Sequence, residues 1–149
     1  HPKIKSYVTF THGEGFGLPI FEAACNGLPV IAPNWSGHID FLYAKEKKKG
    51  KESIKPLFCK VPFTLKPVQK DALFPGLISE DSRWCYVEAL DAKKSMRKVN
   101  KNYSMYLSWA KKLQKELLVK FTKENQHKQL IDELSIDTNQ AFANEVVVL

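Results

Sequence analysis

Two acidic residues and several glycines lie close together near the start of the chain. Residues 13–22 read Gly-Glu-Gly-Phe-Gly-Leu-Pro-Ile-Phe-Glu, with the carboxylates at Glu14 and Glu22. Ionised carboxylates accept hydrogen bonds from hydroxyl groups, and glycines let the backbone approach a ligand because no Cβ stands in the way. These residue types therefore indicate a binding site for a polyhydroxylated ligand.

The elements predicted around this run place the glycines just before a helix. Residues 4–10 are β-branched and aromatic, as in a strand, and residues 18–27 have a proline near their start and a glycine at their end, as in a helix. Free N–H groups and the positive end of the helix dipole attract phosphate at a helix N-terminus. The loop of residues 11–17 is therefore predicted to bind a diphosphate. The two acids would then lie near the hydroxyl groups of a sugar and a ribose on either side of that diphosphate.

The next segment predicts the fold class. Residues 29–33, Pro-Val-Ile-Ala-Pro, are wholly apolar, which is typical of a strand buried on both faces of a parallel sheet. The order strand, helix, strand is a βαβ unit. We therefore expect an α/β fold, a doubly wound parallel sheet with helices on both faces. Such sheets bind ligands at the carboxyl ends of their strands, where the glycines lie.

The middle of the chain has weaker signals. Four prolines interrupt residues 43–82, which we interpret as an irregular insertion or a hairpin, with a strand at residues 57–63. From residue 87 to 134, apolar residues recur in steps of three and four, which predicts helices with a break near Asn100 or Asn102. The last of these helices covers roughly residues 122–134. Residues 136–149 end in Val-Val-Val-Leu and have no predicted partner.

Composition indicates one domain, residues 1–149, of which 44% are apolar and 26% charged. No apolar run approaches the roughly 20 residues of a membrane-spanning helix, and the first residues, His-Pro-Lys-Ile-Lys, do not have the apolar stretch of a signal peptide. The three cysteines are widely spaced without a Cys-x-x-Cys pair, so they indicate neither a disulfide framework nor a zinc site. We expect plain buried or half-buried thiols and a cytoplasmic protein.

The net charge of +7 is compatible with several partners. It suits a nucleic acid, a membrane surface or a small anion such as a nucleotide diphosphate. Much of the excess lies in the run Lys-Glu-Lys-Lys-Lys-Gly-Lys at residues 45–51, and the rest follows the C-terminal helices. Because solvated loops and helix faces also account for such charges, charge alone does not distinguish between these partners.

Other readings of the glycine run have to be compared. A dinucleotide fingerprint would need Gly-x-Gly-x-x-Gly, whereas the chain has Gly-x-Gly-x-Gly with Asp40 as the ribose-binding acid 23 residues after Gly17. Glu14 would also place a negative charge inside its pyrophosphate turn. Glycosidase chemistry would need Glu14 and Glu22 to flank one bond, which their spacing does not establish. Each residue alone also fits an ordinary strand-to-helix turn.

A resemblance favours one of these readings. Residues 11–32, Thr-His-Gly-Glu-Gly-Phe-Gly-Leu-Pro-Ile-Phe-Glu-Ala-Ala-Cys-Asn-Gly-Leu-Pro-Val-Ile-Ala, are similar to the Glu-x7-Glu region of retaining glycosyltransferases with the GT-B fold, family 4 or group 1. The close match extends over about residues 6–42. Beyond it, only the region of Trp84 and the C-terminal helices agree, and weakly.

The resemblance implies the Rossmann-like, C-terminal half of such an enzyme, which holds a nucleotide-diphosphate sugar. It implies that Glu14 is the catalytic residue at the sugar hydroxyls and that Glu22 holds the ribose. It further implies transfer with retention of configuration and without a metal or other cofactor. The donor-binding residues that it implies are Gly13, Gly15, Phe16, Gly17, Leu18, Glu22, Ser36 and Gly37. His38 has no counterpart in the motif, so we interpret it as an ordinary loop histidine.

The same resemblance implies that the acceptor-binding domain and the basic clamp on the diphosphate precede His1. The sheet is then expected to be truncated and the chain alone to be inactive, with an unknown acceptor. Exposed sheet edges pair with other chains, so we hypothesise a homo-oligomer. We expect no nucleic-acid partner and no transmembrane segment. The alternatives are a non-catalytic anion-binding module on the same scaffold and, third, a dehydrogenase-type Rossmann domain.

Overall fold

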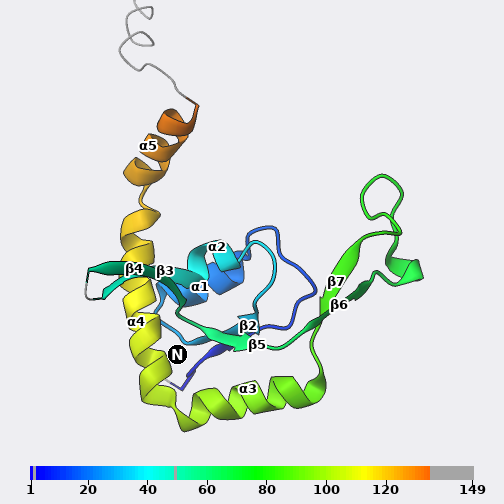
Figure 1. Cartoon of the computed structure of the whole chain (residues 1–149), viewed down its shortest axis with the longest axis horizontal. Coiled ribbons are helices and arrows are strands. Elements are labelled where there is room, and N and C mark those ends of the chain that lie inside the picture. The colour runs from blue at the N-terminus through cyan, green and yellow to red at the C-terminus, as the bar shows by residue number, and fades with distance from the viewer. Residues whose placement is uncertain (2, 49, 135–149) are drawn as a thin grey trace, which may run out of the picture.

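The computed structural model describes residues 1, 3–48 and 50–134 and shows a mixed α/β protein (Figure 1). Within these residues, three short strands form a parallel sheet, four form two antiparallel hairpins, and five α-helices surround them. The strands are β1 (Tyr7–Val8), β2 (Val30–Pro33), β3 (Tyr43–Lys48), β4 (Lys51–Pro56), β5 (Cys59–Val61), β6 (Thr64–Pro67) and β7 (Arg83–Tyr86). The α-helices are α1 (Leu18–Cys25), α2 (Ile39–Leu42), α3 (Ala89–Lys101), α4 (Tyr103–Lys120) and α5 (Lys123–Glu133).

The parallel sheet has the order β1-β2-β5, so β2 is its central strand. Every residue of β2 is buried, as predicted for a strand covered on both faces. Val30 and Ala32 belong to one core cluster and Ile31 to another, because successive side chains of a strand point to opposite faces. Tyr7 pairs with Val30 and Ile31 pairs with Cys59 in the parallel register.

Helices cover both faces of this sheet. On the face of Val30, the core contains Ile20 of α1 and Leu113 and Leu117 of α4. On the face of Ile31, it contains Val99 of α3, beside Cys59 and Val61 of β5. In Figure 1, α3 passes below the sheet while α4 stands beside α1.

The predicted strand at residues 4–10 is shorter in the structure, where only Tyr7–Val8 pairs with a neighbour. Residues 43–82 are more regular than the predicted irregular insertion, and they contain both a hairpin and a strand within residues 57–63, as the prediction allowed. β3 and β4 form one hairpin, β5 joins the sheet within the region proposed for a strand, and β6 pairs with β7. The prolines did not prevent these strands, because Pro56 and Pro67 stand at the ends of two-stranded ribbons, where one edge needs no N–H donor.

The C-terminal helices agree with the predicted pattern. α3 and α4 are separated at Asn102, whose side-chain amide donates to the Lys98 carbonyl at 3.0 Å. α5 begins after Thr122, whose hydroxyl accepts a hydrogen bond from the Asn125 N–H at 3.2 Å. No helix in residues 3–48 or 50–134 is both long and apolar enough to cross a membrane. The apolar end of the chain, within 136–149, lies outside the described residues.

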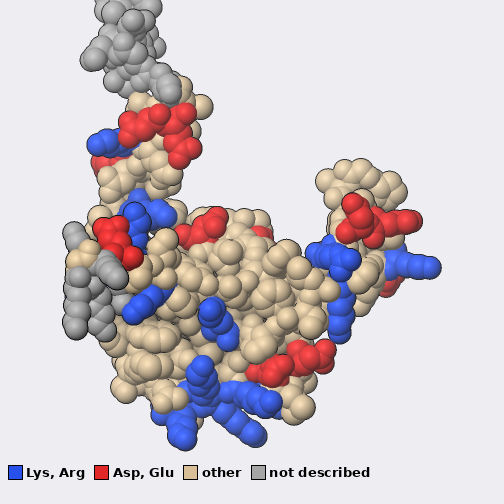
Figure 2. All heavy atoms as spheres, in the orientation of Figure 1, with Lys and Arg blue, Asp and Glu red and all other residues tan. Residues whose placement is uncertain are grey.

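Two features stand out at the surface. Residues 62–86, here called the arm, project from the body as the β6–β7 hairpin and the segment between its strands (Figure 1). Lysine and arginine side chains gather along the lower face, over α3, while acidic side chains appear on the arm and on α5 (Figure 2). Most side chains of the lysine run at residues 45–51 lie outside the described part.

Candidate functional site

The glycine loop, residues 11–17, connects β1 to α1 at the surface. Gly17 has a φ of 87°, a left-handed conformation that favours glycine, and it caps α1 without any side-chain hydrogen bond to the first turn. The first N–H groups of a helix have no intrahelical partner. Pro19 removes one of these donors, and those of Leu18 and Ile20 remain. The loop therefore leads into an uncapped helix N-terminus, as predicted.

A second loop, residues 34–38 and here called the serine loop, is joined to the glycine loop. The Glu14 N–H donates to the Ser36 hydroxyl at 2.8 Å, and the Gly37 N–H donates to the Glu14 carbonyl at 3.0 Å. A Cβ on Gly37 would lie 1.9 Å from the Gly15 carbonyl oxygen, so only glycine fits there. The structure thus brings the predicted residues Ser36 and Gly37 against Glu14 and Gly15.

The two predicted acids are both available to a ligand. Glu14 is half-buried, and its backbone is engaged by the serine loop. Neither its carboxylate nor that of Glu22 has a hydrogen bond or ion pair with any residue that the structure describes. Glu22 is exposed on α1 four residues after the exposed Leu18, so both lie on the same side of the helix.

Phe16 anchors the glycine loop to the body of the protein. Its ring lies 5.4 Å from that of Phe21 and 5.0 Å from that of Phe41, and Phe121 at the end of α4 completes the cluster. The side chain remains 38% exposed, so part of the ring borders the solvent beside the loop. Packing of Phe16 thus holds the loop while its backbone stays accessible.

His38 is not the ordinary loop histidine that the sequence suggests. It is only 1% exposed, and its Nε2 donates to the Pro33 carbonyl at 2.8 Å. Its Nδ1 has no partner among the described residues. The histidine lies beneath the glycine loop, because a Cβ on Gly17 would be 3.2 Å from the His38 Cβ. The burial arises where the two loops meet, which no local signal indicates.

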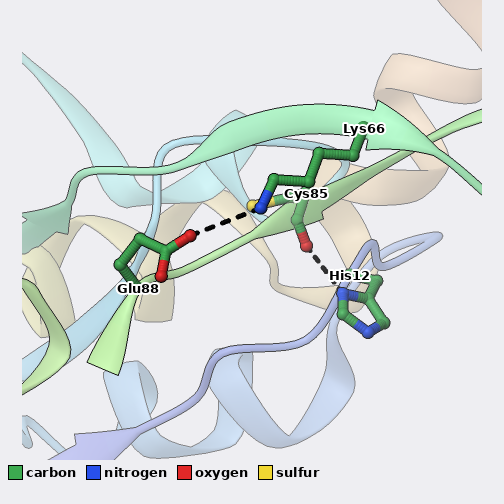
Figure 3. A network of polar contacts seen from close by, with 4 residues as sticks. All are labelled: His12, Lys66, Cys85 and Glu88. Atoms are coloured by element: carbon green, nitrogen blue, oxygen red, sulfur yellow. Dashed lines mark hydrogen bonds and ion pairs between the residues drawn. The ribbon is translucent and has the colours of Figure 1, made fainter.

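A second histidine, also absent from the predicted site, ties the arm to the glycine loop. His12 Nδ1 donates to the Cys85 carbonyl at 2.6 Å, and the Cys85 N–H donates back to the His12 carbonyl at 3.0 Å (Figure 3). The imidazole stacks on Trp84 at 5.0 Å with 6° between the planes, and it lies 4.4 Å from Tyr86. The only sequence signal for this contact between His12 and the arm was the position of His12 next to Gly13 in the glycine loop.

Polar contacts reinforce the base of the arm. Lys66 of β6 and Glu88, just after β7, form an ion pair of 3.3 Å (Figure 3). Both side chains are well exposed, so the pair adds little stability. The contacts of His12 with β7 are therefore the main connection between arm and glycine loop.

A cavity of about 820 Å³ lies away from the glycine loop, between α2, β3 and α4. Its walls include Phe41, Ala44, Ile54 and Leu117, and Asp40 borders it. The dinucleotide reading assigned Asp40 to a ribose beside the glycines, but here this acid lines a different surface. The predicted donor-binding residues form an open surface and not a wall of this cavity.

The cysteines have the structural character that was predicted. All three are free, with Cys59 and Cys85 buried and Cys25 half-buried. Burial raises the pKa of each thiol above its usual range, which keeps the protonated, unreactive form. No three metal-binding side chains gather in the described part of the chain.

The site therefore consists of an exposed glycine loop, the serine loop that fixes it, an uncapped start of α1 and two acids whose carboxylates have no partner within the described part of the chain. The first helix turn offers donors to an anion, and the carboxylates offer acceptors to hydroxyl groups. Comparison of the chain with family models, with curated proteins and with solved structures finds no match.

Proposed function

We propose that this chain is the donor-binding domain of a retaining glycosyltransferase that takes a sugar from a nucleotide-diphosphate sugar. The observation that carries the proposal is the exposed glycine loop, which leads into an uncapped α1 and holds Glu14, whose carboxylate has no partner among residues 3–48 and 50–134. The scaffold proposed for it is a Rossmann-like, doubly wound sheet. In support, helices lie on both faces of the parallel strands β1, β2 and β5.

The diphosphate would lie against the first turn of α1. The N–H groups of Leu18 and Ile20 and the positive end of the helix dipole favour negative charge there. During transfer, the leaving diphosphate gains charge, so the same donors stabilise the transition state more than the ground state. Gly13, Gly15 and Gly17 let the backbone of the loop follow the ligand closely.

The acids would divide the hydroxyl groups of the donor between them. Glu14 lies on the loop and binds the transferred sugar, and Glu22 lies one turn into α1 and binds the ribose. Ser36 and Gly37 position Glu14, because both hydrogen-bond its backbone and leave the carboxylate free. Complete catalysis needs an acceptor-binding partner domain that closes over the donor and excludes water.

Calorimetric titration with UDP, GDP and ADP and their glucose conjugates tests the proposal. We expect one of the nucleotides to bind. Glu14→Gln should leave the affinity for this nucleotide unchanged but lower the affinity for the corresponding nucleotide sugar about tenfold, because one charge-assisted hydrogen bond to the sugar is lost. Glu124→Gln on α5 is the matched control and should change neither affinity.

In the complete enzyme, Glu14→Gln should abolish most turnover without unfolding the domain. Near-normal turnover in that variant would remove Glu14 from the catalytic role. A chain that binds none of the nucleotides at millimolar concentration would contradict the donor-binding proposal as a whole.

One observation also favours the anion-binding module as a second candidate: basic side chains gather over α3 (Figure 2). A module of that kind would bind a polyanion such as DNA through charge alone and would have no pocket for a nucleotide. DNA binding that falls steeply with salt, with no response to any nucleotide, would favour it.

A further inference from the structure

Helix α3 carries five basic side chains and a single acidic one, Asp91. Four of the basic residues lie on one face of the helix, and we call them the basic stripe: Lys93, Lys94, Arg97 and Lys101. Lys94, Arg97 and Lys101 follow one line in steps of three and four, and Lys93 stands beside it, four residues before Arg97. All four are exposed. Leu90 begins the same line and is 68% exposed, so an apolar side chain stands at one end of the stripe.

The stripe faces away from the sheet. The opposite side of α3 is buried through Ala92, Ser95 and Val99, and Val99 packs with β2 and β5 residues. The basic side chains are therefore free to meet a partner without disturbing the core. Only Lys94 has an acidic neighbour among the described residues, Asp91 at 3.9 Å, and that pair is largely exposed.

The N-terminal segment extends the charge beyond the helix. Lys3 and Lys5 are exposed, and Lys5 Nζ lies 5.6 Å from the ring centre of Tyr103, directly after α3. The view of this face shows Lys and Arg side chains grouped along its lower edge, with acidic side chains only toward one end (Figure 2). The N-terminal lysines therefore add to the basic charge at this edge of the molecule.

We propose that the basic stripe docks the protein on the surface of an anionic lipid bilayer. A helix of exposed lysines and an arginine presents a convex line of charge, about 17 Å long from Leu90 to Lys101 at 1.5 Å per residue. Such a line fits a flat, negatively charged surface, where each basic side chain adds to the attraction. Long basic side chains reach the phosphates while Leu90 enters the region between headgroups.

The bilayer fits this face better than a single-stranded nucleic acid does. Binding of single strands relies on exposed aromatic rings that stack with bases, and α3 contains no aromatic residue. An exposed leucine in line with the charges instead suits an apolar medium. Since the other face of α3 is already used in the core, the attachment is mainly electrostatic and weakens with salt.

This proposal is independent of the donor site. The glycine loop lies at the carboxyl end of β1, and α3 covers the opposite region of the molecule below the sheet (Figure 1). A protein docked through the stripe would therefore leave the glycine loop uncovered.

Co-sedimentation with lipid vesicles tests the proposal. The wild-type chain should bind vesicles with about one third phosphatidylserine and not pure phosphatidylcholine vesicles. Changing all four stripe residues to Gln should lower the partition coefficient about 100-fold at 0.1 M salt, because the contributions of the basic residues accumulate. Leu90→Ser alone should lower it a few-fold.

The matched control carries the same loss of charge elsewhere: Lys70, Lys115, Lys123 and Lys128, all changed to Gln. These residues are exposed on the arm, α4 and α5, so the control should keep most of the vesicle binding. Circular dichroism and thermal melting confirm that both variants are folded. Three results would each overturn the proposal. The first is equal binding to anionic and neutral vesicles, and the second is an equal loss of vesicle binding in the stripe variant and the control variant. The third is binding of duplex RNA that is tighter than vesicle binding and depends on the stripe.

Discussion

The glycine loop and the arm both leave the small sheet, but they are held in different ways. The glycine loop is fixed by backbone contacts with the serine loop, so close that a Cβ on Gly37 would meet the Gly15 carbonyl. The arm is held by pairing between its own two strands, and Leu77 in the segment between them is 80% exposed. It meets the glycine loop through His12 and Cys85 at its base.

The difference shows how one chain combines a rigidly held loop with a loosely attached projection. Contacts between two backbones leave no room to adjust, so they define where Glu14 stands. The base of the arm also has one backbone hydrogen bond, from the Cys85 N–H to the His12 carbonyl, but its other contacts with the glycine loop are the stacking and hydrogen bond of the His12 ring, which tolerate more movement. Mutations in the sheet and in the glycine and serine loops should therefore lower the free energy of unfolding much more than mutations in the arm.

The largest expected contrast compares the central strand with the end of the arm. Ile31 is fully buried in β2, so Ile31→Ala should lower the free energy of unfolding by about 3 kcal/mol. Leu77→Ala should change it by less than about 0.5 kcal/mol because the side chain is exposed. Urea denaturation followed by circular dichroism measures both. Equal losses would mean that the arm belongs to the same core.

The next contrast concerns the contact of the two loops. Gly37→Ala should cost about 2 kcal/mol in unfolding free energy, because the new methyl group pushes the serine loop from Gly15. Gly13→Ala is the control, since no atom lies within 4 Å of a Cβ at that position. The same denaturation curves measure both variants. If both glycines tolerate alanine equally, the interlocked arrangement is wrong.

A smaller effect is expected at the base of the arm. Trp84→Ala removes the stack on His12 and should cost about 1 kcal/mol, with faster hydrogen exchange of the Cys85 N–H. Phe74→Ala, at an exposed position of the arm, should leave this exchange unchanged. Exchange measured by mass spectrometry distinguishes the two. Unchanged protection in Trp84→Ala would show that the backbone contact alone holds the arm.

The smallest effect is a pH dependence that arises in the core under α3. Burial raises the pKa of the Cys59 thiol and also raises the pKa of the neighbouring Tyr106 hydroxyl. The unfolded chain then releases these protons at lower pH than the folded one. The stabilisation is therefore complete below the ordinary thiol pKa of about 8.5 and declines as the pH rises toward the folded value.

Urea denaturation at pH 7.5 and pH 9.5 measures this decline. Cys59→Ala and Cys59→Ser both remove the titrating thiol and should make the decline shallower, and the serine keeps a small polar side chain at the position. A free energy of unfolding that rises over this interval would contradict the assigned direction.

Much of the local structure could be predicted from sequence signals that act over a few residues. Pro19 and Gly27 bracket α1, the apolar run at residues 29–33 became the fully buried β2, and the break expected near Asn102 separates α3 from α4. A hairpin was allowed within residues 43–82, but its position and the pairing of β6 with β7 were not predicted, because these strands are short and polar and their pairing depends on distant partners. Prolines suggested irregular chain there, although edge strands tolerate them.

The sequence by itself determined where chemistry can occur: glycines before a helix start, and acids on the loop and one turn into the helix. Only the tertiary structure decided how these residues are held. Ser36 reaches Glu14 across 22 positions, and His12 meets Cys85 across 73. The tertiary structure also decided that His38 is buried beneath Gly17. Such contacts depend on which strands pair and which loops then meet, and no local pattern of residues contains that information.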